Sequence, residues 1–372
     1  MLQKILIVTI FVILLNLFVL KSPLYSGVAV ANEPIEQDLF VWNLDKKQVL
    51  SSKTQIDRLI DFSHKKGIKI LFVQVYRANK AWFPTRYADT SDYDLFHQGS
   101  KNDSFAYLIR EAHKYGIKVH AWMNMLSLSA NGNAPILKKY GFGILTQNRD
   151  IKKVLEDYKI DKQFFLEPSD PRAHKELLAI LEDLLKSHKD LDGIQFDYIR
   201  YPDVHPFYGY SATNIEHFKK LTGVKEINEE DIRWKQFKRD QVTALLKALV
   251  KKARSIRPGI HISTTGCLSY SRAYHEALQE WPLWLKNNLV EFVTVMNYSS
   301  DYAEFEKNIK DIKIKVEDFK KVNIAVGAYK FVKQNKDVFK QQYEYCEQSG
   351  ARACVVFHYS NLTEDSNLAE VL

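Results

Sequence analysis

The chain of 372 residues has only three cysteines, Cys267, Cys346 and Cys354. An odd and sparse set of this kind does not make a disulfide framework, and its spacings fit no zinc-binding pattern. The chain also lacks a glycine-rich phosphate loop, an H-E-x-x-H helix and a G-x-S-x-G elbow, which disfavours nucleotide chemistry, zinc proteolysis and serine hydrolysis. We therefore expect no metal and no cofactor, and a fold stabilised by its core.

The sequence contains no compact basic run with interleaved aromatics, so nucleic acid is not an expected partner despite a formal charge of +8. Much of the excess charge lies in lysines scattered along helix-like segments such as Lys307–Lys321, a pattern typical of a solvated face. Aromatic residues, by contrast, make up 13% of the chain. Their flat apolar faces suit sugar rings as well as a packed core.

The first thirty residues have the pattern of a secretory signal. Lys4 precedes the apolar run 5–20, and Ala29-Val30-Ala31 fits an A-x-A cleavage site. We predict a signal peptide over residues 1–31, a mature domain over residues 32–372, and a periplasmic, extracellular or cell-surface location. An apolar run of about sixteen residues is short for a spanning helix, so a membrane is an expected partner only if the leader stays uncleaved.

Beyond the leader, short β-rich runs alternate with amphipathic helical segments at parallel-sheet connection lengths. Eight such alternations specify a single-domain α/β fold, a (β/α)₈ TIM barrel, more economically than a doubly wound sheet. The first strand is predicted over Asp38–Leu44, one helix with an internal Pro282 over Tyr274–Lys286, and a long insertion over Met125–Pro168 that covers one side of the site. The eight strand candidates are centred near Phe40, Leu71, Val119, Ile194, Ile262, Val293, Ile324 and Val355.

The segment Leu191–Pro202 (L-D-G-I-Q-F-D-Y-I-R-Y-P) organises the rest of the chain. Its apolar strand ends at the carboxylate of Asp197. The carboxyl end of a buried parallel strand is where barrel enzymes carry their catalytic side chains. Hydrolysis of a sugar polymer usually requires two carboxyl groups with different pKa values. Asp197 is the first candidate, Glu167 its partner and Asp301 the reserve, although Asp197 also fits a structural role as a cap and Glu167 one as a cap or ion pair.

Other polar and aromatic residues at the strand ends are candidates for substrate binding. The arginines among them suit either a neighbouring carboxylate or an acidic sugar substituent, and core packing is the competing role for the aromatic ones. Asp192 and Glu291 precede their strands and are expected at the opposite, stabilising face. The candidates are Gln74, Tyr76, Arg77, Trp82, Trp122, Asn124, Arg200, Tyr201, Asn297, Tyr298, His358 and Tyr359.

Five ordered motifs resemble the glycoside hydrolase-like family 10, exported bacterial TIM-barrel glycosidases. They are D-G-I-Q-F-D-Y-I-R-Y-P, E-A-H-K-Y-G-I-K-V-H-A-W-M-N, F-L-E-P-S-D-P, V-T-V-M-N-Y and V-V-F-H-Y-S, within Phe40–Leu362. The resemblance implies hydrolysis of bacterial glycans, including peptidoglycan strands without their peptides, with Asp197 as a main catalytic carboxylate. The family usually has Asn or Asp where this chain has Glu167.

The chain departs from the family 18 chitinases. Their D-G-x-D-x-D-x-E motif would place the proton donor at Ile199, which cannot donate a proton, so this chain has no such acid in that motif. Three hypotheses follow. The first is a glycosidase of an amino-sugar polymer, most directly peptidoglycan glycan of the cell wall; the others are a non-catalytic glycan-binding protein on a degenerate barrel and a hydrolase of a hexosamine exopolysaccharide.

Overall fold

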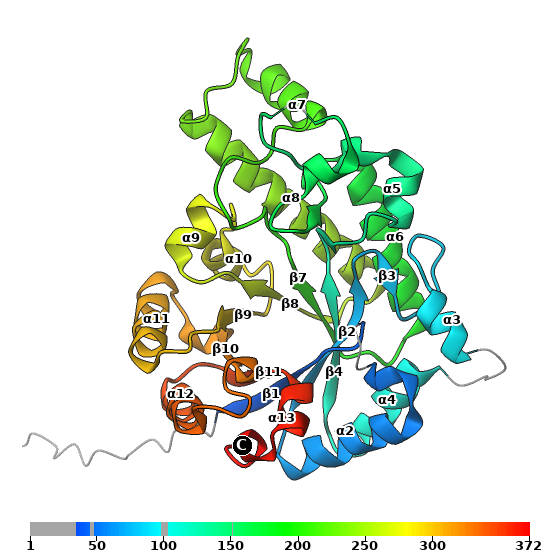
Figure 1. Cartoon of the computed structure of the whole chain (residues 1–372), viewed down its shortest axis with the longest axis vertical. Coiled ribbons are helices and arrows are strands. Elements are labelled where there is room, and N and C mark those ends of the chain that lie inside the picture. The colour runs from blue at the N-terminus through cyan, green and yellow to red at the C-terminus, as the bar shows by residue number, and fades with distance from the viewer. Residues whose placement is uncertain (1–34, 45–47, 98–102, 151) are drawn as a thin grey trace, which may run out of the picture. The chain divides into compact units, whose positions relative to one another are not determined.

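Eight parallel strands close into a barrel in the computed structural model, which describes residues 35–44, 48–97, 103–150 and 152–372 (Figure 1). Each strand pairs with the next, and the first strand closes the ring by pairing with both the second and the last. The predicted (β/α)₈ TIM barrel is thus confirmed. The barrel strands are β1 (Glu36–Val41), β2 (Ile70–Arg77), β4 (Lys118–Asn124), β7 (Gly193–Asp197), β8 (His261–Gly266), β9 (Phe292–Asn297), β10 (Val322–Gly327) and β11 (Ala353–Phe357).

Helices connect the successive strands and follow the last one. Five short 3₁₀ turns in the described residues are η1 (Val49–Ser51), η2 (Phe142–Ile144), η3 (Leu155–Tyr158), η4 (Phe319–Lys321) and η5 (Ala328–Lys330). The α-helices are α2 (Lys53–Lys65), α3 (Ser91–His97), α4 (Ser104–His113), α5 (Pro135–Tyr140), α6 (Pro171–Ser187), α7 (Ala212–Thr222), α8 (Ile232–Ile256), α9 (Tyr270–His275), α10 (Trp281–Lys286), α11 (Tyr302–Lys315), α12 (Lys336–Gln348), α13 (Tyr359–Glu364) and α14 (Ser366–Ala369).

The helix ends carry the capping residues that their sequences predict. Ser52 accepts a hydrogen bond from the Gln55 amide at the start of α2, and Gly67, at φ +67°, follows the end of that helix. Asp170 caps α6, whose first helical residue is Pro171. These local signals determine where the two helices begin and where α2 ends.

The interior of the barrel is filled by large side chains from alternating strand positions. Phe40, Phe72, Trp122 and Phe292 belong to one buried cluster inside the barrel, with the Phe40 and Trp122 rings 4.9 Å apart in an edge-to-face arrangement. A larger cluster fills the space between the strands and the helices. The barrel is therefore a packed core, and only its carboxyl-terminal mouth is free to form a site.

The insertion over Met125–Pro168 is folded. Its strands β5 (Ser127–Ser129) and β6 (Phe164–Phe165) form a small antiparallel sheet of their own. A third short strand, β3 (Lys80–Ala81), pairs with the end of β2. These additions enlarge the barrel at the connections that follow β2 and β4.

Three details differ from the sequence predictions. The first strand begins and ends earlier than Asp38–Leu44, and the single helix predicted over Tyr274–Lys286 is wrong. The chain breaks there into α9 and α10, because Leu278 has a positive φ of 54° and Pro282 occupies the first turn of a new helix. Helix α7 was not predicted.

One disulfide, Cys346–Cys354, links α12 to β11, and Cys267 is a buried free thiol. A single bridge is no framework, but the sparse cysteines gave no reason to expect it. Within the described residues, no helix has the length and apolar character needed to cross a membrane. The predicted leader, residues 1–31, lies outside those residues.

Candidate active site at the barrel mouth

Asp197, the last residue of β7, is buried and accepts four hydrogen bonds. Trp122 Nε1 (2.9 Å) and Asn124 Nδ2 (3.2 Å) donate to its Oδ2. Thr265 Oγ1 (2.5 Å) and the amide of Tyr198 (2.7 Å) donate to its Oδ1. All four partners are donors, which suits an ionised carboxylate because it only accepts hydrogen bonds. The strands on both sides of β7 thus fix the carboxylate in one orientation.

The hydrogen-bond network extends from Asp197 across the mouth to Leu44, in the segment that follows β1. The amide of Leu44 donates to Gln74 Oε1 (3.3 Å), and Gln74 Nε2 donates to Asn124 Oδ1 (3.0 Å). Asn124 then donates to Asp197. The side-chain amides of Gln74 and Asn124 therefore each accept a hydrogen bond through their oxygen and donate one through their nitrogen, in the direction of Asp197. Such a chain fixes the amide orientations and preorganises the carboxylate without any ligand.

The backbone after Asp197 adopts an unusual conformation. Tyr198 has a φ of 55°, in the left-handed region that non-glycine residues occupy at a cost of about 1 kcal/mol or more. This turn lets the Tyr198 amide point back to the Asp197 carboxylate. The ring of Tyr198 contributes to the same cavity and lies 4.6 Å from the Arg200 guanidinium.

A cavity of about 130 Å³ opens at Asp197. Half of the residues in its walls are aromatic, and Asp197 is the one carboxylate among the described residues that line it. Burial raises the pKa of the Tyr298 phenol well above its usual value, and the charge of Asp197 adds to the effect. The lining residues are Phe40, Trp42, Gln74, Arg77, Trp122, Asn124, Asp197, Tyr198, Thr265, Met296, Tyr298 and Phe357.

A second cavity, of about 360 Å³, adjoins the first and shares Met296 and Tyr298 with it. It brings two further carboxylates, Asp203 and Glu304, to the mouth. Burial acts to raise the pKa of Asp203, but Arg200 (2.7 Å) and Arg272 (2.9 Å) outweigh it and hold that pKa below the usual value. Asp203 therefore stays ionised at neutral pH, whereas Glu304 accepts a hydrogen bond from Ser299 Oγ at 2.6 Å.

Six of the fifteen predicted site residues line the Asp197 cavity, and the structure places the other nine elsewhere. Arg200 and Asn297 line the adjoining cavity, where Asn297 bonds to Asn308. Sequence reasoning missed Trp42 and Phe357, whose signal was an aromatic residue at or just beyond a strand end. The predicted residues that line the Asp197 cavity are Gln74, Arg77, Trp122, Asn124, Asp197 and Tyr298.

Glu167 lies away from the Asp197 cavity, with a fully buried side chain. Tyr201 donates a short hydrogen bond to its Oε1. Burial raises the pKa of Glu167 above its usual value. Hydrogen bonds with Tyr201 and other hydroxyl groups, and the charge of Lys238, lower it but do not outweigh burial. The pair joins the end of the insertion to the segment after β7, which is the geometry of a structural anchor.

The other predicted residues do not line the Asp197 cavity. Tyr76 and Trp82 are buried. Tyr76 Oη accepts a hydrogen bond from Asn79 Nδ2, and Trp82 Nε1 donates one to Ser104. Asp301 is exposed and caps α11 by accepting a hydrogen bond from the Glu304 amide. The His358 ring contacts the Trp42 ring, and the Tyr359 ring contacts Phe62. The structural placement of Asp192, which accepts from the Val119 amide, fits the expected bottom face.

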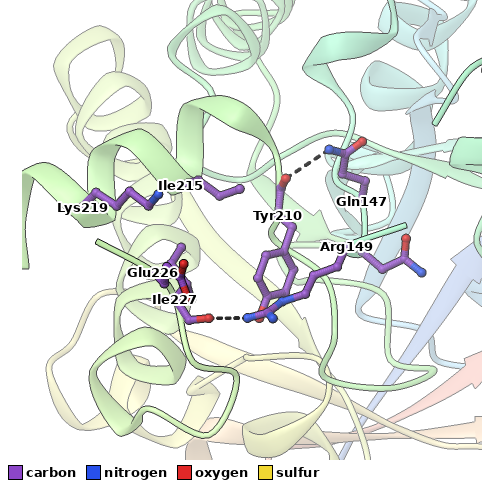
Figure 2. A pocket seen from close by; sticks show the side chains of 8 residues that line it. Gln147, Arg149, Tyr210, Ile215, Lys219, Glu226 and Ile227 are labelled. Atoms are coloured by element: carbon purple, nitrogen blue, oxygen red, sulfur yellow. Dashed lines mark hydrogen bonds between the residues drawn. The ribbon is translucent and has the colours of Figure 1, made fainter. Parts of the chain in front are cut away.

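A separate hollow of about 470 Å³ is lined by residues of the insertion and by residues in and around α7 (Figure 2). Arg149 from the insertion stacks on Tyr210 and donates a hydrogen bond to the Ile227 carbonyl. The insertion was expected to cover one side of the site, but none of its described residues lines the Asp197 cavity. Among the residues that the structure describes, no group of three or more His, Cys, Asp or Glu side chains is placed to hold a metal ion.

Comparison with solved structures places the fold among glycosidase barrels. The catalytic domain of a β-amylase from Paenibacillus polymyxa superposes with a TM-score of 0.58 at 10% identity, over 91% of this chain and 97% of that chain. A β-galactosidase from the psychrophilic Marinomonas ef1 gives 0.58 at 8% identity, over 87% and 54%. At such identities the likeness shows the fold alone.

Sequence comparison identifies relatives among curated proteins. Glycosyl hydrolase DigH of Escherichia coli K12 is 23% identical over 276 residues, covering 67% of this chain and 58% of that protein. Glycosyl hydrolase YngK of Bacillus subtilis 168 is 24% identical over 269 residues, covering 66% and 47%. The chain thus spans about half the length of these relatives. The model of the glycosyl hydrolase-like 10 family matches residues 35–346, and the chain belongs to that family.

Proposed function

We propose that the protein is an exported glycoside hydrolase with Asp197 as its main catalytic carboxylate. The observation that carries the proposal is the Asp197 carboxylate, fixed by four donors at the end of a barrel strand and facing an aromatic cavity. A fixed carboxylate can act on the anomeric carbon as a nucleophile, or on water as a base. Membership of a glycosyl hydrolase-like family supports this choice over other chemistries of the barrel.

The proton donor of the reaction has to be a second acidic group. Asp203 is unsuited because its two arginine partners keep it ionised. Glu304, the other carboxylate of the adjoining cavity, is exposed and accepts a hydrogen bond from the Ser299 hydroxyl, with no salt bridge to an arginine or lysine among the described residues. We therefore assign Glu304 as the candidate proton donor in place of Glu167 and Asp301, which make structural contacts.

The proposed substrate is an amino-sugar polymer, most directly peptidoglycan glycan strands without their peptides. Aromatic side chains such as Trp42, Trp122 and Tyr298 provide flat faces for sugar rings. The predicted signal peptide would deliver the enzyme to the compartment that contains this polymer. The family resemblance supports the same substrate class.

The test is release of reducing ends from peptide-free glycan strands by the mature protein. Wild type should release them, and Asp197→Asn should lose at least about 1,000-fold in kcat because the variant cannot carry the charge that the reaction needs. Glu304→Gln should lose activity as well, and more strongly on substrates with a poor leaving group. Undiminished release by Asp197→Asn would refute the assignment.

One observation favours a second candidate, a non-catalytic glycan-binding protein. Asp197 is the single carboxylate lining its cavity among the described residues, and a glycosidase needs two. If the protein only binds glycan, calorimetry should detect binding to glycan strands. No reducing ends should then be released from peptidoglycan or from a partly deacetylated hexosamine polymer. Turnover of the hexosamine polymer alone would instead identify an exopolysaccharide hydrolase.

A further inference from the structure

Arg77, the last residue of β2, contributes a guanidinium group to the wall of the Asp197 cavity. The side chain is half-buried and lines the cavity. It stacks over the Trp42 ring, with 4.8 Å between the guanidinium carbon and the ring centroid. Among the described residues, no carboxylate forms a salt bridge with it. Stacking holds the planar group in place and leaves its N–H donors available to a ligand.

The other arginines at the mouth are neutralised within the protein. Arg200 and Arg272 share the carboxylate of Asp203, at 2.7 and 2.9 Å. Arg272 also lies 3.5 Å from Glu276. Arg77 therefore differs from both, because its charge has no carboxylate partner among the residues that the structure describes.

A second donor beside Arg77 also has no acceptor. The indole nitrogen of Trp42, the ring on which Arg77 stacks, is buried and makes no hydrogen bond with the described residues. Trp42 lines the same cavity. An indole N–H can only donate, so a ligand oxygen that reaches this side of the cavity would find a donor there beside the Arg77 guanidinium.

We propose that Arg77 and Trp42 form a subsite for a carboxylate carried by the sugar next to the scissile bond. The inference rests on the proposed function and adds the chemical class of the substituent. A carboxylate matches the planar fork of an arginine and accepts bonds from both donors. Asp197 does not compete with the ligand for Arg77, because its two carboxylate oxygens already accept four hydrogen bonds. The donors are Trp122, Asn124, Thr265 and the Tyr198 amide.

Sugars with an ether-linked lactyl group carry such a carboxylate in bacterial walls. When a peptide is attached, the carboxylate becomes a neutral amide and loses the charge that Arg77 would bind. The subsite therefore gives a physical reason for selecting strands from which the peptides have been removed. A polymer of plain N-acetylglucosamine lacks the group altogether and should bind less well.

The test compares two polymers with the same backbone. One is peptide-free glycan with free lactyl carboxylates, and the other is the same preparation with those carboxylates converted to methylamides. Wild type should cleave the free acid with a kcat/KM about 10-fold or more higher, as expected for loss of a charge-assisted hydrogen bond. Arg77→Gln should cleave both at the lower rate, and Arg77→Lys should keep part of the preference.

Arg86→Gln is the matched control. Arg86 also stacks on an aromatic ring, 5.0 Å from the centroid of Tyr87, and follows the same strand, but it does not line the cavity. Its removal changes the net charge equally and should leave the preference intact. Equal cleavage of the two polymers by wild type, or an unchanged preference in folded Arg77→Gln, would overturn the proposal, and the wild-type comparison needs no variant to fold.

Calorimetry with Asp197→Asn separates this inference from the proposed hydrolysis. If no polymer is cleaved but the free acid binds at least 10-fold more tightly than the amide, and Arg77→Gln abolishes that difference, the subsite stands and hydrolysis fails. Equal binding of both polymers, or binding of neither, refutes the subsite. Cleavage of both polymers at equal rates refutes the subsite and leaves the hydrolase.

Discussion

At the scale of single residues, the Asp197 carboxylate depends on hydrogen bonds from β4 and β8. Thr265→Val removes one of them, from Oγ1 to Oδ1, while keeping the shape of the side chain. We expect kcat on glycan strands to fall about 10-fold or more, since a bond to a charged group contributes about 1.5–3 kcal/mol. Activity is measured with reducing-end release, and folding with the urea midpoint.

The control for this variant is Thr264→Val on the same strand. Thr264 is equally buried, but its hydroxyl makes only a long 3.4 Å contact with a backbone carbonyl. It should retain most of the wild-type kcat. If the two variants lose activity to the same extent, Thr265 acts through the packing of β8 and not through Asp197.

Gly193, at the start of β7, is a residue that the barrel interior requires for space. An added Cβ would lie 2.5 Å from the imidazole ring of His120, which is fully buried. Gly193→Ala should destabilise the fold by about 1–3 kcal/mol, because an overpacked core has to shift. Chemical denaturation measures the loss. Gly259→Ala, where nothing lies within 4 Å of the added carbon, should leave the stability within about 1 kcal/mol.

The positions of β2 show why one predicted site residue, Tyr76, does not reach the cavity. Gln74 and Arg77 both face the cavity although they are three residues apart, whereas strict alternation would select Gln74 and Tyr76. The pairing of β2 with β4 shifts register between Gln74 and Tyr76. A bulge of this kind changes which face a side chain occupies. The sequence pattern does not reveal the bulge, so Tyr76 was placed in the site together with Gln74 and Arg77.

At the scale of elements, strands and helices were predictable where local signals agree. All eight strand centres were found, because each is an apolar β-rich run between helical segments. Helix α7 was missed although Ser211 and Gly223 cap its two ends. Its buried face is small, since only Asn214 and Phe218 are buried, and the periodicity is correspondingly weak.

The role of Glu167 could not be read from its place before α6. Its partner Tyr201 follows β7, 34 residues later, and the two meet only when the insertion packs against that segment. Long-range contacts of this kind leave no mark in a local pattern. Asp197, by contrast, is at the end of an apolar strand, which made its position at the mouth predictable.

Lys238 on α8 makes the stability of the folded protein depend on pH. Its ammonium group is buried and donates to the carbonyls of Pro206 (2.8 Å) and Tyr208 (2.9 Å). Burial lowers the pKa of Lys238 to about 8, although Glu167 favours the charged form. Between about pH 8 and the unfolded value near 10.5, the unfolded chain therefore binds more protons than the folded one.

The free energy of unfolding should thus gain a favourable contribution from Lys238 as pH rises through this window, of up to about 3 kcal/mol. Below pH 8 the cost of the buried charge is present in full. Urea titrations at pH 7.5 and 10 measure the slope in wild type and in Lys238→Met. The variant should show a smaller rise, and identical slopes in the two proteins would contradict the expectation.

At the scale of the whole molecule, the Cys346–Cys354 bridge connects the last connecting helix to the strand that completes the barrel with β1. Replacing both cysteines by serine should lower the free energy of unfolding by about 2–3 kcal/mol, because the unfolded chain gains freedom. Thermal unfolding with and without reductant measures the difference. Wild type should respond to the reductant and the double variant should not.

The same bridge gives the chain a chemical record of the compartment in which it folded. Disulfides form in oxidising compartments and are rare in the cytosol. Of the three cysteines, Cys267 stays a thiol in the folded protein. Alkylation of the denatured chain, without reduction, should therefore label one cysteine in protein recovered from outside the cytoplasm and three in protein retained within it. Mass spectrometry of these two populations would report export directly, independently of whether any glycan is cleaved.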